Sequence, residues 1–119
     1  MKAAVTLKKN YEFRRVYSKG KSGVSPFLVV YARANHSGKN RMGVTVSTKL
    51  GKAVVRNRVR RRLREIYRLS QPELKQGCDI ILVARTRAVG ARYDELERAY
   101  RRCCEKLGLL AAAADGAKP

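Results

Sequence analysis

The middle of the chain reads Lys52-Ala-Val-Val-Arg-Asn-Arg-Val-Arg-Arg-Arg-Leu-Arg-Glu-Ile-Tyr-Arg68. Seven arginines fall within thirteen residues of this stretch, and Val55, Val59, Leu63 and Ile66 recur at the three- and four-residue spacing of a helix. Because side chains three and four apart lie on one face of a helix, the apolar residues form a stripe and most arginines point away from it. We therefore predict a helix that packs its stripe on the rest of the protein and turns a cationic face toward a polyanion.

The composition of the whole chain agrees with a polyanionic partner. The chain has 119 residues, of which 45% are hydrophobic, and 28 Lys and Arg against 9 Asp and Glu give it a formal net charge of +19. This length and hydrophobic content fit one domain with a buried core. So large a charge repels itself, and nucleic acid is the partner that most often compensates it, with a membrane surface as the second candidate.

The arginines of residues 52–68 also differ from an ordinary solvated helix face. Such faces mix charges of both signs, whereas here only Glu65 opposes the arginines. Arginine, rather than lysine, suits bidentate contacts with phosphate. These features favour a nucleic-acid contact for this helix.

Neither a membrane span nor a disulfide framework is expected. No run approaches the roughly 18 apolar residues of a membrane helix, and Lys8 and Lys9 interrupt the apolar residues near the N-terminus. The three cysteines are an odd number, and Cys103 and Cys104 are adjacent. We expect a cytoplasmic protein with no membrane partner and with reduced thiols, Cys103 lying in the core.

The remaining sequence predicts further helices and strands around the arginine helix. A first helix is predicted over 7–17, with Asn10 as its cap and Gly20 beyond its end. A final helix is predicted to open at a capping box formed by Asp94 and Glu97. Strands are predicted over 27–34 (buried on both faces), 42–47 and 79–84, with another between 23 and 26 or merged into the next.

This order of elements predicts an α+β fold. Helices that pack against one sheet, as a two-layer sandwich, are the simplest way to bury the apolar stripes. The last residues, 111–119, are rich in alanine and of low complexity, and we expect them to form a frayed tail.

Two aromatic residues of the first predicted helix have two interpretations. Phe13 and Tyr17 lie four residues apart, on one helical face, with Arg14 and Arg15 beside them. Such a pair ordinarily packs in a core. Alternatively, the rings line an exposed cleft and stack on unpaired bases, as in single-strand-binding proteins. Periodicity alone does not choose between these two interpretations.

Motifs of enzyme chemistry are weak in this chain. Gly20-Lys21-Ser22 resembles the end of a phosphate loop, but Arg15 occupies the position of the required first glycine. His36 is the only histidine, and the cysteines lack the spacing of a metal site. Solvated or capping roles are expected for four carboxylates, Asp79, Asp94, Glu95 and Glu97. We therefore predict neither a catalytic residue nor a metal ligand.

Four segments, in this order, resemble the bacterial ribonuclease P protein subunit. They are Phe13 to Tyr17 preceded by Leu-Lys-Lys-Asn, Arg41-Met-Gly-Val-Thr-Val-Ser-Thr-Lys49, Gly51-Lys-Ala-Val-Val-Arg-Asn-Arg58, and Asp79-Ile-Ile-Leu-Val-Ala-Arg85. The Arg-Asn-Arg motif within the basic helix is that family's signature. The resemblance spans about residues 7 to 107, and the ordered set is more specific than any single motif.

The resemblance implies a particular fold. It is a sandwich of order αβββαβα, similar to domain 2 of ribosomal protein S5, with a four-stranded sheet and a left-handed βαβ crossover. General topology rules alone predict a right-handed crossover. The resemblance also implies one ribonuclease P protein domain over residues 1–110, followed by a disordered tail over 111–119.

The resemblance further implies a function as an accessory subunit. In this family the RNA subunit hydrolyses precursor tRNA, which removes the 5′ leader, with Mg²⁺ bound mainly by that RNA and its substrate. Expected contacts to the catalytic RNA come from Arg56, Asn57, Arg58, Arg60, Arg61 and Arg64. Expected contacts to the leader of the precursor tRNA come from Phe13, Tyr17, Val30, Thr45, Ser47 and Lys49. Many relatives carry a second lysine where this chain has Thr48, so the charge at this edge is lower.

Two other functions stay open at this point. A non-catalytic RNA-binding protein of ribosomal or chaperone type would share the basic helix but would not recognise the leader. A protein-only nuclease would need clustered carboxylates to hold metal ions, and the sequence shows no such cluster.

Overall fold

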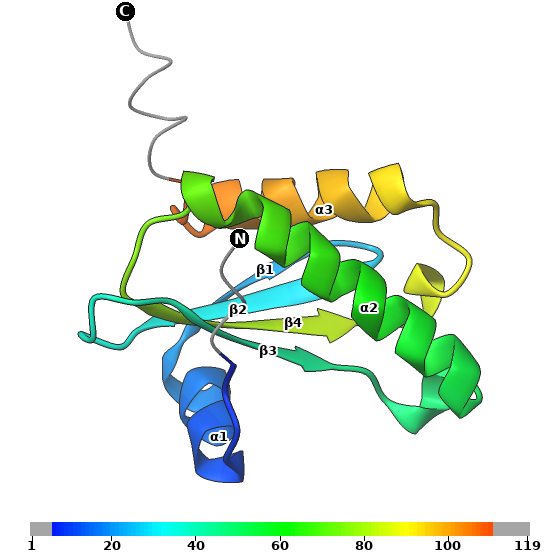
Figure 1. The fold of residues 1–119 in the computed structure, drawn as a ribbon, viewed down its shortest axis with the longest axis horizontal. Coiled ribbons are helices and arrows are strands. Elements are labelled where there is room, and N and C mark those ends of the chain that lie inside the picture. The colour runs from blue at the N-terminus through cyan, green and yellow to red at the C-terminus, as the bar shows by residue number, and fades with distance from the viewer. Residues whose placement is uncertain (1–5, 111–119) are drawn as a thin grey trace, which may run out of the picture.

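The computed structural model describes residues 6–110, and the termini outside this range, including the predicted tail over 111–119, are left aside. Three helices and four strands form one compact unit (Figure 1). In chain order they are α1 (Asn10–Lys19), β1 (Lys21–Val24), β2 (Leu28–Ala34), β3 (Arg41–Thr45), α2 (Ala53–Ser70), β4 (Cys78–Ala84) and α3 (Tyr93–Lys106). Short 3₁₀ turns, η1 (Thr48–Leu50), η2 (Gln71–Glu73) and η3 (Thr86–Ala88), connect them.

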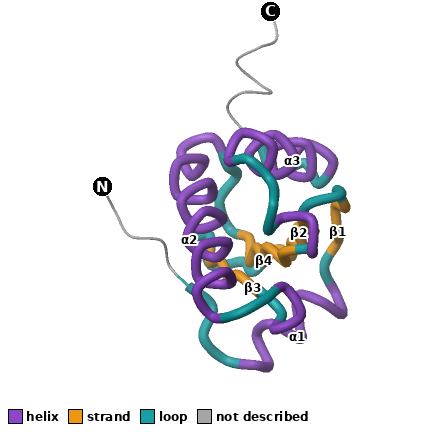
Figure 2. The backbone as a smooth tube through the Cα atoms, turned by 90° about the vertical axis from the view of Figure 1, so that its right-hand side faces the viewer, coloured by secondary structure: helices purple, strands orange, loops and turns teal. Residues whose placement is uncertain are grey.

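The four strands form one mixed sheet in the order β1-β2-β4-β3. The pairs β1–β2 and β2–β4 are antiparallel, whereas β3 and β4 are parallel neighbours joined through α2. Helices α2 and α3 cover one face of the sheet and α1 lies on the other (Figures 1 and 2). With α2 on that face, the β3–α2–β4 connection is left-handed, as the family resemblance implies and against the usual preference.

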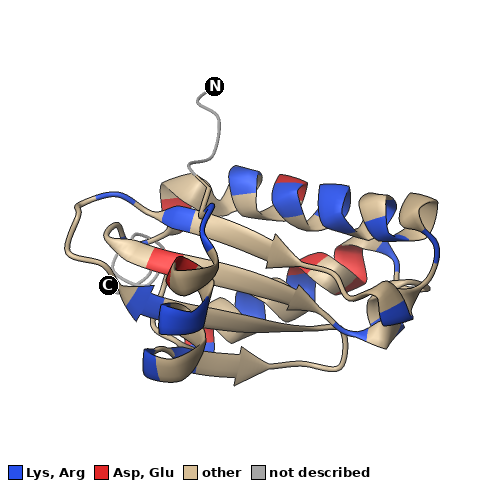
Figure 3. Ribbon diagram, turned by 90° about the horizontal axis from the view of Figure 1, so that it is seen from below, with Lys and Arg blue, Asp and Glu red and all other residues tan. Residues whose placement is uncertain are grey.

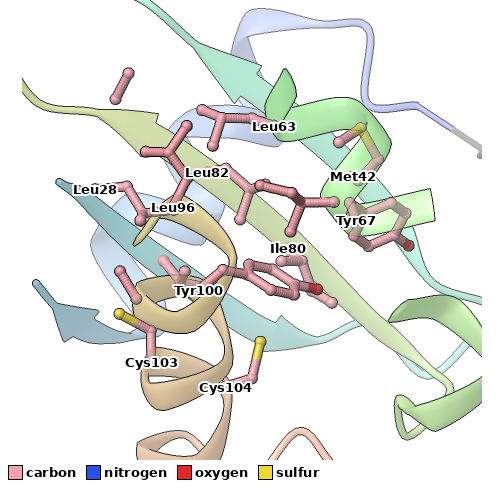
Figure 4. Close-up of a cluster of buried hydrophobic side chains, with 14 of the residues drawn as sticks. Leu28, Met42, Leu63, Tyr67, Ile80, Leu82, Leu96, Tyr100, Cys103 and Cys104 are labelled. Carbon is pink, nitrogen blue, oxygen red and sulfur yellow. The ribbon is translucent and has the colours of Figure 1, made fainter. Parts of the chain in front are cut away.

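The larger core fills the space between the sheet and the helices α2 and α3 (Figure 4). The rings of Tyr67 from α2 and Tyr100 from α3 are fully buried there, and the Tyr100 hydroxyl lies 2.8 Å from the Ser70 Oγ atom. A smaller cluster, with Val16 and Ile81 at its centre, packs beneath α1. Side chains alternate along a strand, so β4 supplies both cores: Ile80 and Leu82 to the larger one, Ile81 to the smaller.

The first helix starts later than predicted. It begins at Asn10 with Lys9 as its N-cap, so the predicted capping role of Asn10 is wrong. Its first turn is stabilised instead by Glu12, whose carboxylate accepts hydrogen bonds from the backbone N–H groups of Lys8 (2.9 Å) and Lys9 (3.0 Å). Leu7, predicted as helical, is extended and donates its N–H to the Met42 carbonyl at 2.8 Å.

The capping box predicted for the final helix is also displaced. Helix α3 begins at Tyr93, and Glu95 accepts a hydrogen bond from the backbone N–H of Arg92 at 2.9 Å. Asp94 instead forms ion pairs with Arg92 and Arg98, each at 3.1 Å. Residues 92 and 95 have the same three-residue spacing as 94 and 97. Spacing alone therefore does not say which pair caps the helix, and the end of the preceding loop determines it.

The predicted place of Cys103 in the core is confirmed, and Cys104 is buried beside it (Figure 4). Both are free thiols, and burial raises the pKa of each, that of Cys104 to about 12. These cysteines therefore behave as small apolar core residues. Within residues 6–110, no helix combines the length and the apolar character that crossing a bilayer requires.

Candidate nucleic-acid interface

Helix α2 presents the predicted division between an apolar stripe and a cationic face. Val59, Leu63 and Ile66 are buried against the sheet, and Tyr67 is buried with them. Lys and Arg positions far outnumber Asp and Glu positions over the fold (Figure 3). Four arginines and one asparagine lie on the outer side of α2, and we call them the arginine surface. They are Asn57, Arg58, Arg60, Arg61 and Arg64.

The arginine surface is shaped as well as charged. Asn57, Arg60, Arg61 and Arg64 line a shallow hollow of about 550 Å³. Within it, the Arg60 Nη1 atom donates a hydrogen bond of 2.6 Å to the Asn57 Oδ1 atom, which orients this guanidinium. A hollow lined by three guanidinium groups is suited to an anion such as a phosphate.

Other arginines of α2 have structural contacts. Arg56, predicted to contact RNA, donates from Nε to the Gly51 carbonyl oxygen at 3.0 Å and so braces the start of the helix. Arg62 donates to the Ala91 carbonyl oxygen at 3.1 Å. Arg68 pairs with Glu65 at 2.7 Å. Some arginines of α2 therefore stabilise the fold, and others line the hollow.

A groove lies on the opposite face of the sheet, between α1 and the outer strand β3. Its volume is about 660 Å³, and we call it the α1–β3 groove. It is lined by Asn10, Phe13, Arg14, Tyr17, Val44, Thr45 and Val46. Three of the six residues predicted to contact the leader, Phe13, Tyr17 and Thr45, meet here although they come from separate segments.

The two aromatic side chains of α1 both pack on the sheet and line the groove. The Phe13 ring lies on Gly43, where an added Cβ atom would come within 2.6 Å of the ring, so only glycine fits there. The Tyr17 hydroxyl oxygen lies 3.0 Å from the Thr45 Oγ1 atom. The Tyr17 ring meets the Tyr31 ring edge-on, with the ring centroids 4.9 Å apart. Because Tyr17 remains 38% exposed, core packing and stacking on a ligand are compatible for it.

Val30 does not belong to this groove. Its side chain has no exposed surface and lies in the larger core, on the face of the sheet covered by α3. The expectation that it contacts the leader is therefore wrong. Alternation along β2 places its neighbour Tyr31 on the α1 side instead, beside Tyr17. The sequence carries no signal that identifies Tyr31, because its position follows from the pairing of β2 with β4, which sets Tyr31 opposite Ile81.

Ser47 and Lys49, also predicted leader contacts, lie outside the groove lining. Both are exposed in the connection between β3 and α2. The Ser47 Oγ atom accepts a hydrogen bond of 3.2 Å from the Lys49 backbone N–H, which caps the η1 turn. These residues therefore stand where the chain passes from the groove to the arginine helix.

A polar network at the start of β3 was missed by sequence reasoning. Asp79 is only 2% exposed, and its carboxylate accepts hydrogen bonds of 2.8 Å from the Nε and Nη2 atoms of Arg41. Arg41 also pairs through Nη1 with Glu12 at 2.7 Å. The solvated or capping role expected for Asp79 is wrong, because the parallel register of β3 and β4 sets Arg41 directly beside it.

The hydrogen bonds of this network shift its titration. The backbone N–H groups of Lys9 and Lys8, together with the Arg41 charge, lower the pKa of Glu12. The hydrogen bonds to Asp79 raise the pKa of Arg41. Glu12 and Arg41 are thus held in their charged forms. Among residues 6–110, no group of three or more His, Cys, Asp or Glu side chains is placed to hold a metal ion.

Comparison with known proteins relates the chain to one family. A family model described as Ribonuclease P matches residues 1–108. The ribonuclease P protein component of Alkaliphilus oremlandii is 47% identical over 113 residues, which cover 95% of this chain and 99% of the relative. That of a Thermoanaerobacter species is 50% identical over 107 residues, with 90% and 92% covered.

Solved structures show the same similarity. The ribonuclease P protein of Staphylococcus aureus superimposes with a TM-score of 0.83 at 31% identity, covering 91% of this chain and 99% of that one. The ribonuclease P protein of Thermotoga maritima superimposes with a TM-score of 0.75 at 27% identity, covering 82% and 92%.

Proposed function

This chain belongs to the ribonuclease P protein family, and we propose that it is the protein subunit of ribonuclease P. In this role it binds a catalytic RNA and the 5′ leader of precursor tRNA, and it promotes endonucleolytic removal of the leader. The observation that carries the proposal is the presence of two different concave surfaces on one small basic domain: a hollow lined by arginines and an aromatic groove.

The arginine surface is the proposed contact with the catalytic RNA. Structured RNA presents phosphates at high density, and each arginine that neutralises one releases condensed counterions. The hollow at Asn57, Arg60, Arg61 and Arg64 offers charge and hydrogen-bond donors together. Arg56 precedes these residues in the sequence and Arg58 lies among them, and we propose that both extend the same contact.

The α1–β3 groove is the proposed contact with the leader. Single-stranded RNA exposes the faces of its bases, which stack on aromatic side chains, and a nearby cation contacts the backbone. Phe13 and Tyr17 supply such rings and Arg14 supplies the cation. A duplex offers no free base face to this groove, so the groove favours the unpaired leader over the folded tRNA body.

A short segment of the chain connects the two surfaces. Strand β3 ends at Thr45 in the groove, and the η1 turn leads directly into α2. The exposed residues Ser47 and Lys49 lie in this connection. We propose that they contact the substrate where it passes from the groove toward the RNA subunit.

The cleavage chemistry is assigned to the RNA subunit. In this proposal Mg²⁺ is bound mainly by the catalytic RNA and the substrate, and it supplies an activated water for hydrolysis of the phosphodiester. The carboxylates beside the groove, Glu12 and Asp79, are already paired with Arg41 and do not form a set of metal ligands. The protein reduces phosphate repulsion where substrate and RNA meet, in the cytoplasm.

Reconstitution at low magnesium tests this function. Purified protein is added to its catalytic RNA and a precursor tRNA, and cleavage is followed as the magnesium concentration is lowered. We expect the protein to restore cleavage at concentrations where the RNA alone is inactive. Unchanged cleavage would contradict the proposal, and equal affinity for tRNA with and without a leader would favour a general RNA-binding protein. Cleavage by the protein without RNA would indicate a protein-only nuclease.

A further inference from the structure

Helix α1 contacts β3 through three side chains. Glu12 pairs with Arg41 at 2.7 Å, Phe13 packs on Gly43, and the Tyr17 hydroxyl lies 3.0 Å from Thr45 Oγ1. Residues 41, 43 and 45 alternate along β3, so all three point to the face on which α1 lies. The contacts therefore fix the first turn of α1, at Glu12 and Phe13, and a point one turn further along, at Tyr17.

Arg41 is the centre of the first of these contacts. Its Nε and Nη2 atoms form a bidentate pair with Asp79, whose side chain is 3% exposed, and Nη1 reaches Glu12, whose side chain is 14% exposed. The Asn35 side-chain amide donates a further hydrogen bond of 2.8 Å to Asp79. The guanidinium is thus held against the sheet on one side and holds the helix on the other.

Glu12 connects this network to the helix backbone. One carboxylate oxygen, Oε1, accepts the N–H groups of Lys8 and Lys9 at the start of α1, and the other, Oε2, accepts Arg41. A single side chain therefore joins the first turn of α1 to the fixed guanidinium. Each Arg41 nitrogen already donates to a carboxylate of the protein, so three of its five N–H groups are committed to internal contacts.

We propose that Arg41 is a positioning residue for the leader: through Glu12 it fixes the first turn of α1 against β3 and thereby holds Phe13 and Tyr17 in the positions from which their exposed surfaces stack on unpaired bases. This inference rests on the proposed function of the groove. It assigns leader recognition to an ion pair outside the groove lining.

The sharpest test replaces Glu12 and leaves the buried Asp79–Arg41 pair intact. Glu12→Ala removes both the helix cap and the connection to Arg41, and it makes the protein more positive by one charge. Charge alone would strengthen RNA binding. We expect instead that affinity for a precursor tRNA with a leader falls about threefold to tenfold, whereas affinity for mature tRNA does not fall.

Glu73→Ala is the matched control. Glu73 forms a bidentate pair with Arg101, at 2.8 and 2.9 Å, between η2 and α3 on the other side of the sheet. Its removal changes the net charge by the same amount and breaks a comparable pair. We expect no loss of leader preference in this variant. Glu12→Gln keeps the chain length and one acceptor oxygen for the helix N–H groups, but its NH2 group replaces the oxygen that accepts from Arg41. We therefore expect this variant to lose part of the leader preference.

A double variant tests whether Glu12 acts through the aromatic groove. If it does, Glu12→Ala should add little to the loss caused by Phe13→Ala. Additive losses, an equal loss for mature tRNA, or the same behaviour in Glu73→Ala would overturn the positioning role. Should Glu12→Ala fail to fold, a folded Glu12→Gln that loses leader preference would support the role, because the amide breaks the pair with Arg41. Full leader preference in Glu12→Gln would overturn it. The absence of leader preference in the unmodified protein would instead contradict the proposed function.

Discussion

The arginine surface and the α1–β3 groove are built in opposite ways. The arginine surface takes all its residues from one stretch of α2, residues 57–64, whose geometry follows from helical periodicity. The groove is formed by residues of α1 and by residues of β3 and its C-terminal end, and Tyr31 of β2 packs against the groove residue Tyr17. The difference shows that a charged contact needs only a helix with a docked apolar stripe, whereas a stacking site needs several segments in register.

The two surfaces also differ in how their side chains are shared with the fold. Arg61 and Arg64 are exposed, and their replacement leaves the core unchanged. Phe13 and Tyr17 belong both to the groove and to the packing of α1 on the sheet. Substitutions should therefore affect binding alone at the arginine surface, and binding together with local order at the groove.

The largest effect is expected for Arg60, Arg61 and Arg64 replaced together by Ala. Loss of three phosphate contacts should lower affinity for the catalytic RNA roughly hundredfold to thousandfold. The slope of log affinity against log salt should become shallower by about 2 to 3. Binding titrations over a range of salt concentrations measure both quantities.

The control for this variant removes the same charge from another basic hollow. Lys19, Lys21 and Arg33 line a concavity at the other end of the molecule, near the end of α1. Their replacement by Ala should weaken binding much less. Equal losses from the two triple variants would mean that net charge, not the arginine surface, determines affinity.

Phe13→Ala tests the groove. Stacking on one base contributes about 1–3 kcal/mol, so affinity for leader-containing tRNA should fall roughly fivefold to a hundredfold. Affinity for the catalytic RNA alone should stay the same. Phe27→Ala is the natural control, since Phe27 is the other phenylalanine and lies at a different site, with the Arg87 guanidinium 5.9 Å from its ring. A comparable loss for mature tRNA would show that Phe13 serves the core rather than the leader.

Val30→Ala separates the two faces of β2. Val30 is fully buried, so losing two methyl groups should lower the free energy of unfolding by about 2 kcal/mol, measured by urea denaturation. The folded variant should bind leader-containing tRNA as the unmodified protein does. If the variant kept full stability and lost affinity only for leader-containing tRNA, Val30 would be a leader contact after all.

Tyr17→Phe should have a smaller effect. The ring remains for stacking, while the hydrogen bond to Thr45 is lost, so leader affinity should fall about twofold to fivefold. Thr45→Val removes the same hydrogen bond from the other side. Because both changes break one interaction, the double variant should lose no more than either single variant.

The smallest expected effect is in the dependence of stability on pH. The pKa of Glu12 lies below its ordinary value near 4.5, so its ionised form contributes stability above that pH, and this contribution is lost as the pH falls through the lowered pKa. Glu12→Gln should therefore flatten the decline of unfolding free energy below pH 4.5. Arg61→Gln, a substitution on the exposed face of α2, should leave the decline unchanged.

The local pattern of the chain predicted much of the fold. Hydrophobic spacing placed α2 and its buried Val59, Leu63 and Ile66 correctly, because helical periodicity depends only on neighbouring residues. The left-handed crossover came from the family resemblance alone. Both capping predictions were wrong, at Asn10 and at Asp94 with Glu97, since several nearby residues met the same spacing rule.

Errors at the candidate site share one physical cause. Val30 and Tyr31 are adjacent in an apolar strand, and their order does not say which of them faces which helix. Asp79 looks solvated in isolation, but pairing between β3 and β4 brings Arg41 to it. Each error concerns contacts between residues far apart in the chain.

By itself, the sequence determined that this protein is a basic α+β domain with an arginine-rich helix and a buried apolar stripe, because charge and periodicity are properties of consecutive residues. Only the tertiary structure decided which side chains form the groove, how Arg41 fixes α1 over β3, and where Val30 lies. Strand register and the packing of α1 set those contacts, and both are fixed only when distant segments meet.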